Sequence, residues 1–163
     1  MVNTYNLLIM PKISAGLVMW RIREGKTEFL LVHQGGPFWK NKDEGAWSIP
    51  KGEVEKNEEG LAAAQREFEE ETGFKPEGEF KLLSPIRQKS GKVVRAWSFE
   101  GDCDPTAMKS ITFKVRLPWS GKEEEFPEAD KAAFFCFEEA VKKINPAQAA
   151  LLKEIVDNII NKR

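Results

Sequence analysis

A dense group of carboxylates near the middle of the chain is the part of the sequence best suited to chemistry. Glu67, Glu70 and Glu71 lie within five consecutive residues. Because each residue of an α-helix turns about 100°, Glu70 falls near about −60° and Glu71 near about +40° when Glu67 is set at zero. Like charges on one helix face repel, but three converging carboxylates form a hard oxygen site suited to Mg²⁺ or Mn²⁺. The alternative is a solvated acidic helix face.

Two glycines, a further glutamate and an arginine stand at fixed distances around this cluster. Residues 52–74 read GEVEKNEEGLAAAQREFEEETGF, which contains Gly52, Glu58, Arg66 and Gly73. Asn57 is the predicted N-cap of the helix, and Gly73 suits its C-terminal stop. A solvated acidic face requires no such spacing, so the complete pattern favours a metal site.

The same 23 residues, 52–74, resemble the signature of the Nudix hydrolase family, G-x5-E-x7-R-E-U-x-E-E-x-G-U with U apolar. Every specified position of that signature is filled. The resemblance implies a hydrolase of nucleoside diphosphates linked to another moiety, with Mg²⁺ or Mn²⁺ as the cofactor. It also implies a Nudix-type α/β/α sandwich with a mixed β-sheet, in which residues 52–74 form a loop-helix-loop.

The resemblance assigns a role to each position of the signature. In the family, the carbonyl at the position of Gly52 is a metal ligand, and residues at the positions of Glu58 and Arg66 pair to orient the loop and the helix. The implied catalytic residues are Glu58, Arg66, Glu67, Glu70 and Glu71, and the implied metal ligands within the signature are Gly52, Glu67, Glu70 and Glu71.

The general base is open between two positions. Glu67 is the first candidate because it lies on the predicted metal face, but some Nudix enzymes use a glutamate outside the signature. The segment EFPEADKAAFF resembles a stretch of the diadenosine-polyphosphate hydrolases that carries an extra metal-binding glutamate and ends in tryptophan. Glu128 matches that glutamate, with Phe134 in place of the tryptophan. The alternative for Glu128 is a charged surface loop.

Residues outside the carboxylate cluster are candidates for substrate binding. The run WSIPKG, which contains Lys51, resembles the W-x-x-P-K-G entry of the diadenosine-polyphosphate and diphosphoinositol branches. A longer stretch around it resembles bacterial proteins classed as predicted nucleoside-triphosphate pyrophosphohydrolases. Lys51 can meet a phosphate as a point charge, and Trp39, in a glycine-rich loop, can stack on a base. Arg87 and Lys89 share one side of a predicted hairpin and are further phosphate candidates.

The remaining sequence predicts many strands and few helices. Strands are expected at 13–22, 28–33, 47–50, 81–87, 92–100, 110–117 and 132–137, and further helices at 138–144 and 147–161. This order predicts an α/β layered fold with a mixed sheet. At 163 residues, the chain fits a single domain over residues 1–163.

Composition limits the partners and the compartment. The net charge is −1 and the pI about 6.0, so the basic footprint of a long nucleic-acid partner is missing. Two cysteines in a chain of this length are typical of reduced thiols rather than a disulfide framework. The N-terminal run MVNTYNLLIMPK is too short for a signal peptide, and no run is long enough to span a membrane. We therefore expect a cytoplasmic monomer or homodimer that binds a small nucleotide.

Several functions remain open. The favoured reaction is cleavage of a dinucleoside polyphosphate such as diadenosine tetraphosphate, followed by a nucleoside triphosphate, with ADP-ribose or capped RNA as other substrates. A nucleotide-sensing module without turnover is the main alternative. Family members that become sensors often lose carboxylates of the signature, whereas this chain keeps Glu58, Glu67, Glu70 and Glu71. An acidic helix that binds a protein partner is a third reading, but it leaves Gly52 and Gly73 without a reason.

Overall fold

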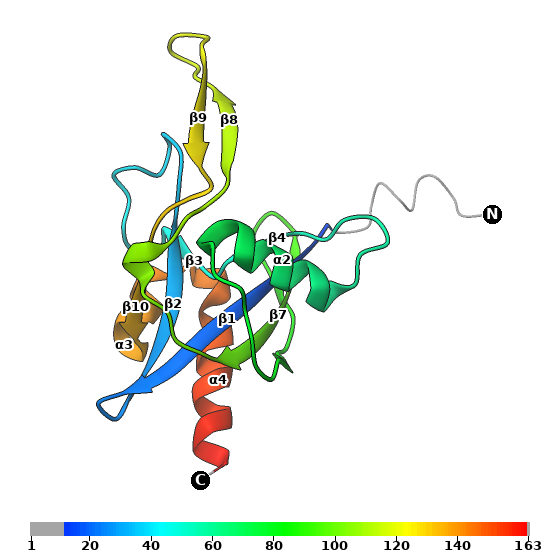
Figure 1. The fold of residues 1–163 in the computed structure, drawn as a ribbon, viewed down its shortest axis with the longest axis vertical. Helices are drawn as coiled ribbons and strands as arrows, with labels where there is room; N and C mark the ends of the chain where they lie inside the picture. Colours follow the sequence, from blue (N-terminus) through cyan, green and yellow to red (C-terminus); the bar gives the residue numbers. More distant parts are fainter. Residues whose placement is uncertain (1–11, 163) are drawn as a thin grey trace, which may run out of the picture.

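The computed structural model describes residues 12–162 and confirms a mixed α/β architecture (Figure 1). Residues 1–11, on which the signal-peptide prediction depends, lie outside this range. The main sheet consists of β1 (Ile13–Arg23), β2 (Lys26–Gln34), β3 (Trp47–Ser48), β4 (Lys51–Glu53), β5 (Lys81–Leu82), β6 (Ile86–Arg87), β7 (Val93–Glu100) and β10 (Ala129–Cys136). Strands β8 (Thr112–Arg116) and β9 (Glu123–Pro127) form a separate hairpin. The α-helices are α2 (Gly60–Thr72), α3 (Phe137–Lys143) and α4 (Ala149–Asn161), and Pro105–Ala107 and Pro146–Gln148 are short 3₁₀ helices.

The main sheet is mixed, with the order β10-β2-β1-β7-β5. β1 pairs with β7 in parallel, whereas the other pairings are antiparallel. β1 and β2 pair directly only near their hairpin turn, at residues 20–23 and 26–29. Away from that turn β1 pairs with β4 and β2 pairs with β3. The two long strands therefore separate at one end, and the chain leading into α2 lies there.

Helices cover both faces of this sheet, because β1 presents alternate side chains to each. Leu17 and Met19 belong to a buried cluster with Phe68 of α2. Val18, between them, belongs to a second cluster with Leu151 of α4. Two apolar cores with one sheet between them make an α/β/α sandwich, as the sequence predicts. No helix within residues 12–162 has the length and apolar character of a membrane span.

The predicted N-cap of α2 is wrong, although the predicted helix end is confirmed. The helix begins at Gly60, its N-cap is Glu59, and no side chain caps it. Asn57 instead adopts a left-handed conformation with φ of 64° in the preceding loop, a conformation that asparagine tolerates better than most residues. Gly73 has φ of 79° and donates its N–H to the Glu69 carbonyl, so a glycine ends the helix as expected.

Two strand predictions also differ from the structure. The expected strand at 81–87 is divided into β5 and β6, because Pro85 lies between them and offers no N–H to a ladder. Residues 123–127, expected as charged coil before a strand, form β9. Three consecutive glutamates are unusual in a strand, but here Glu123 and Glu125 lie opposite Arg116 and Lys114 of β8. Opposite charges across a strand pair stabilise such a hairpin.

Candidate active site

A cavity of about 520 Å³ opens where β1 and β2 separate. Its walls come from α2, from the strands of the main sheet, from the loop after β2 and from the root of the β8–β9 hairpin. The lining residues are Ser14, Val32, Gln34, Gly35, Trp39, Ser48, Lys51, Gly52, Glu53, Glu67, Glu71, Lys92, Phe113 and Glu128.

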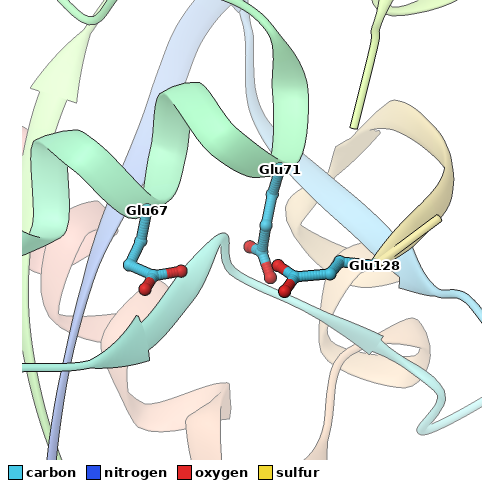
Figure 2. A group of neighbouring side chains, drawn as sticks. All are labelled: Glu67, Glu71 and Glu128. Atoms are coloured by element: carbon cyan, nitrogen blue, oxygen red, sulfur yellow. The ribbon is translucent and has the colours of Figure 1, made fainter. Parts of the chain in front are cut away.

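Three carboxylates converge in this cavity. Glu67, Glu71 and Glu128 each offer an oxygen, and these oxygens all lie within 4.8 Å of one another. Figure 2 shows Glu67 and Glu71 descending from successive turns of α2, and Glu128 reaching toward them from a different part of the chain. Three carboxylates this close repel strongly unless they are protonated or share a cation. The donor set is all oxygen and suits a hard divalent ion such as Mg²⁺ or Mn²⁺.

Glu71 carries the most strongly perturbed carboxyl of the three. Burial raises its pKa well above the ordinary value, and the charges of Glu67 and Glu128 raise it further. The Lys51 backbone N–H donates to Glu71 Oε2 at 2.9 Å, which opposes this shift. Burial also raises the pKa of Glu67 and of Glu128. Three raised carboxyl pKa values in one cavity are a common sign of a functional site.

The carboxylate of Glu67 lies directly over the backbone of Gly52. A Cβ atom at Gly52 would lie 2.1 Å from Glu67 Cδ and 2.2 Å from Glu67 Oε2, far inside van der Waals contact. Only glycine therefore allows β4 to approach the carboxylate this closely. The approach explains why glycine is needed fifteen residues before Glu67, in terms of packing alone.

Arg66 ties the loop before α2 to the acidic face of the helix. Its Nε and one terminal nitrogen donate to the two oxygens of Glu58, at 2.8 and 3.0 Å, and the other terminal nitrogen donates to Glu67 Oε1 at 2.9 Å. This bidentate pair lowers the pKa of Glu58 to about 2. Glu70 accepts from Arg66 at 3.1 Å and is not among the three converging carboxylates. The structure thus brings Glu128, rather than Glu70, beside Glu67 and Glu71.

Glu128 is held in place through its backbone rather than its side chain. Its N–H donates to the Ile111 carbonyl at 2.9 Å, and its own carbonyl accepts from Gly35 N–H at 2.8 Å. Ile111 N–H in turn donates to the Glu70 carbonyl near the end of α2. A Cβ at Gly35 would lie 1.8 Å from the Pro127 carbonyl oxygen, so this crossing also requires glycine. The segment around Ile111 therefore links Glu128 to the helix that carries the other two carboxylates.

Two lysines line the cavity beside these carboxylates, and only one of them was among the predicted phosphate-binding residues. Burial lowers the pKa of Lys51, and the charge of Lys92 lowers it further. Lys92 Nζ lies 3.4 Å from Glu53 Oε1. The predicted Arg87 and Lys89 do not line the cavity: both are exposed, and Arg87 donates to the Gly91 carbonyl. The turn closes through Gln88 N–H to Lys92 O, which brings Lys92 back toward β1.

Two aromatic rings line part of the cavity. Trp39, predicted as a base-stacking residue, lines it together with Phe113 of β8. Lys42 Nζ lies 4.8 Å from the centre of the Trp39 ring. Phe113 passes over the loop after β2, where a Cβ at Gly36 would lie 3.1 Å from the ring. No sequence pattern singled out Phe113, because it reaches the cavity only through the hairpin.

Two polar residues near the cavity have contrasting surroundings. Ser14 lines the cavity and is fully buried, and its hydroxyl has no hydrogen-bond partner among residues 12–162. His33 is fully buried as well, but both ring nitrogens have partners, Asp130 Oδ1 at 2.8 Å and the Lys42 carbonyl at 2.6 Å. Full burial with a partner for each ring nitrogen indicates a structural role for His33. These contacts also fix the loop that carries Trp39.

The NUDIX domain family model matches residues 10–155, and the chain therefore belongs to this family. The match extends the resemblance seen in residues 52–74 to most of the chain. Together with the fold of the solved Nudix structures, it supports the prediction of a pyrophosphohydrolase. No curated protein matches the chain significantly.

Solved structures with this fold include proteins of different activities. A Caenorhabditis elegans Ap4A hydrolase in a binary complex has a TM-score of 0.66 and 22% identity, covering 91% of this chain and 98% of its own. The NUDIX domain of Shewanella oneidensis NrtR, complexed with ADP ribose, has a TM-score of 0.65 and 12% identity, covering 97% and 99%. A mutT/nudix family protein from Listeria innocua has a TM-score of 0.64 and 18% identity, covering 94% and 97%. At these identities the similarity establishes the fold alone.

Proposed function

We propose that this protein is a hydrolase dependent on Mg²⁺ or Mn²⁺ that cleaves a pyrophosphate linkage in a nucleoside diphosphate-linked substrate. A dinucleoside polyphosphate such as diadenosine tetraphosphate is the favoured substrate, and a nucleoside triphosphate is the next. The observation that carries the proposal is the convergence of Glu67, Glu71 and Glu128 in a cavity that also contains Lys51 and Lys92. Acidic and basic groups in one cavity match a cation and a phosphate chain bound side by side.

The three carboxylates fit a divalent ion because only one of them forms a salt bridge among residues 12–162. Glu67 pairs with Arg66, and it shares this arginine with Glu58 and Glu70. Glu71 accepts from a backbone N–H, and its raised pKa reflects unfavourable ionisation without a cation. Glu67, Glu71 and Glu128 would hold the ion, with the Gly52 carbonyl as the ligand that the family resemblance adds. When bound, such an ion neutralises phosphate charge and makes water a better nucleophile.

The protein residues around the ion would orient the reactants and accept a proton. Glu67 is the first candidate for the base, and Glu128 is the second. Arg66 fixes the rotamer of Glu67 through a 2.9 Å hydrogen bond and would keep its oxygens aligned with the reacting water. Glu58 would act indirectly, because both of its carboxylate oxygens accept hydrogen bonds from Arg66 and fix that side chain. Glu70 accepts from the same Arg66 nitrogen as Glu67 and would also help to hold this arginine in place.

The substrate would lie with its phosphates between the acidic and basic groups of the cavity. Lys51 and Lys92 would meet phosphate oxygens, and Ser14 beside them offers a hydroxyl that has no hydrogen-bond partner among residues 12–162. Trp39 and Phe113 would hold a base by stacking, a contact worth about 1–3 kcal/mol per base. Arg87 and Lys89 stay outside this arrangement because neither lines the cavity.

A nucleotide panel tests this function. Diadenosine tetraphosphate, ATP, ADP-ribose and a capped RNA oligonucleotide would each be incubated with Mg²⁺ or Mn²⁺, and the products separated by chromatography. We expect turnover of the dinucleoside polyphosphate first. Glu71→Gln should reduce kcat by about 1,000-fold, because it removes charge from the centre of the carboxylate cluster. The variant should remain folded, because glutamine has the same shape.

Lys81→Met is the control. Lys81 is an exposed charge on β5 that does not line the cavity, so its loss should leave kcat unchanged. Binding of nucleotides without release of any phosphate product, under either metal, would favour the sensor over the hydrolase.

A further inference from the structure

The β8–β9 hairpin places a pair of exposed aromatic rings outside the cavity. The hairpin stands apart from the main sheet, as Figure 1 shows, and its turn carries Trp119. Trp119 is 67% exposed, the largest exposed fraction among the large apolar side chains of residues 12–162. Phe38, in the loop between β2 and β3, is 54% exposed. The two ring centres lie 6.5 Å apart in an edge-to-face arrangement.

The outer pair lies on the same two segments as the rings that line the cavity. Phe38 is the neighbour of Trp39 in the loop, and Trp119 follows Phe113 on the hairpin by six residues. Neither Phe38 nor Trp119 is among the residues that line the cavity, so the outer pair is distinct from the pair formed by Trp39 and Phe113. One aromatic pair thus lies in the cavity, and a second lies outside it on the same loop and hairpin.

Stacking rather than ionic attraction is the interaction that this surface offers. An edge-to-face pair covers few of the flat ring surfaces, so ring faces stay open to a planar ligand. The hairpin strands have mixed charge, with Lys114 opposite Glu125 and Arg116 opposite Glu123. Such alternating charges do not create the field of one sign that binds a long polyanion.

We propose that Phe38 and Trp119 form a second base-stacking site, which holds the far nucleoside of a dinucleoside polyphosphate. The inference rests on the proposed function, because the near nucleoside would lie on Trp39 and Phe113 with the phosphate chain beside the carboxylates. A mononucleotide carries a single base and would occupy only one of the two pairs. The outer pair therefore selects substrates that carry a base at each end.

The test compares two substrates across matched variants. With Mg²⁺, kcat/KM would be measured for diadenosine tetraphosphate and for ATP in the wild type, Phe38→Ala, Trp119→Ala and Trp119→Phe. We expect each alanine variant to lose about tenfold on the dinucleotide, the order of a base-stacking contact, and less than twofold on ATP. Trp119→Phe should retain most of the activity, because phenylalanine keeps a stacking face. Ile160→Ala, at an equally exposed position (62%) on α4, is the control and should change neither substrate.

Several results of these measurements would overturn the second stacking site. Equal losses on both substrates would mean that Phe38 and Trp119 only brace the loop against the hairpin, and unchanged values for both would remove the site altogether. If the wild type hydrolyses neither substrate, the proposed function fails. Calorimetric binding of diadenosine tetraphosphate and ATP in Ca²⁺ then decides the inference separately: weaker dinucleotide binding by Trp119→Ala supports it, and equal or absent binding overturns it.

Discussion

Helix α2 and the β8–β9 hairpin both contribute residues to the cavity, but different interactions hold them in place. Helix α2 packs Ala64 and Phe68 into the core beneath the sheet, and Arg66 bonds its acidic face to the preceding loop. The hairpin has its own two-stranded sheet, and it meets the rest of the molecule through backbone hydrogen bonds at its root and through the contact of Trp119 with Phe38. A two-stranded ribbon alone is marginally stable in water.

Under the proposed function, this difference would assign the chemistry and the selection of substrate to separate parts of the molecule. Carboxylates on a rigid helix keep the geometry that a metal requires. Rings on a projecting ribbon can change without disturbing that geometry. Substitutions near α2 should therefore act mainly on kcat, and substitutions along the hairpin and the loop mainly on KM.

After Glu71→Gln, the largest effect on kcat is expected from Gly52→Ala. The added methyl would overlap the Glu67 carboxylate, because its Cβ would lie 2.1 Å from Glu67 Cδ. A displacement of about 1 Å in a catalytic group can cost roughly 100-fold in rate. We expect kcat to fall by about that factor, with KM changed much less, as measured by steady-state kinetics.

Gly25→Ala is a useful control for Gly52→Ala. Gly25 has φ of 76°, and a Cβ there would contact nothing within 4 Å. The strained backbone should lower the free energy of unfolding by about 1 kcal/mol and leave kcat unchanged. A Gly52→Ala variant with wild-type kcat would show that Glu67 needs no close approach to β4.

A tenfold effect is expected from the cavity lysine that the sequence did not single out. Lys92→Met should raise KM by about tenfold, because a charge-assisted contact to phosphate is lost. Arg87→Ala and Lys89→Ala should each change KM by less than twofold, since neither residue lines the cavity. If Arg87→Ala raises KM as much as Lys92→Met, the phosphates lie along the hairpin of β6 and β7 instead.

Stability should respond to pH in opposite directions at Glu71 and Glu58. The folded-state pKa of Glu71 is raised well above 4.5, so the folded state binds more protons there. Without metal, its contribution to stability falls as pH rises from 4.5 through the raised pKa. The folded-state pKa of Glu58 is about 2, so its contribution is present above 4.5 and is lost as pH falls toward 2.

Urea unfolding in EDTA and in Mg²⁺ between pH 2 and 8 would check both directions. Mg²⁺ at ten times its Kd should add about 1.4 kcal/mol at pH 7, and Glu71→Gln should remove most of that gain. A gain from Mg²⁺ that survives in Glu71→Gln would place the ion elsewhere.

Much of the part of the candidate site that α2 carries could be predicted from sequence, because its residues are close together in the chain. Glu67 and Glu71 share a face by helical geometry alone, and Gly73 ends the helix as its type suggests. Glu70 lies on the same side, yet it accepts from Arg66. Helical angles cannot show this preference, since they carry no information about where an arginine side chain reaches.

The cavity residues outside α2 were harder to predict, because their positions depend on the pairing of strands that are distant in the sequence. Lys92 lies opposite Gln88 across a turn over residues 89–91, and the parallel pairing of β7 with β1 brings it to the cavity. Phe113 is positioned by the register of β8 with β9, and β9 itself was missed because EEEFP lacks the composition of a strand. Glu128 was found only through a family resemblance, as its backbone contacts come from Gly35 and Ile111.

The hydrogen bond from Glu128 N–H to the Ile111 carbonyl closes the base of the hairpin. The chain between these two residues projects as the β8–β9 hairpin and returns to the same point. We therefore expect Glu128 to keep its position when residues near the hairpin turn are shortened, lengthened or exchanged. Changes to this hairpin are therefore a route to new substrate preferences that leaves the carboxylates on α2 unaltered.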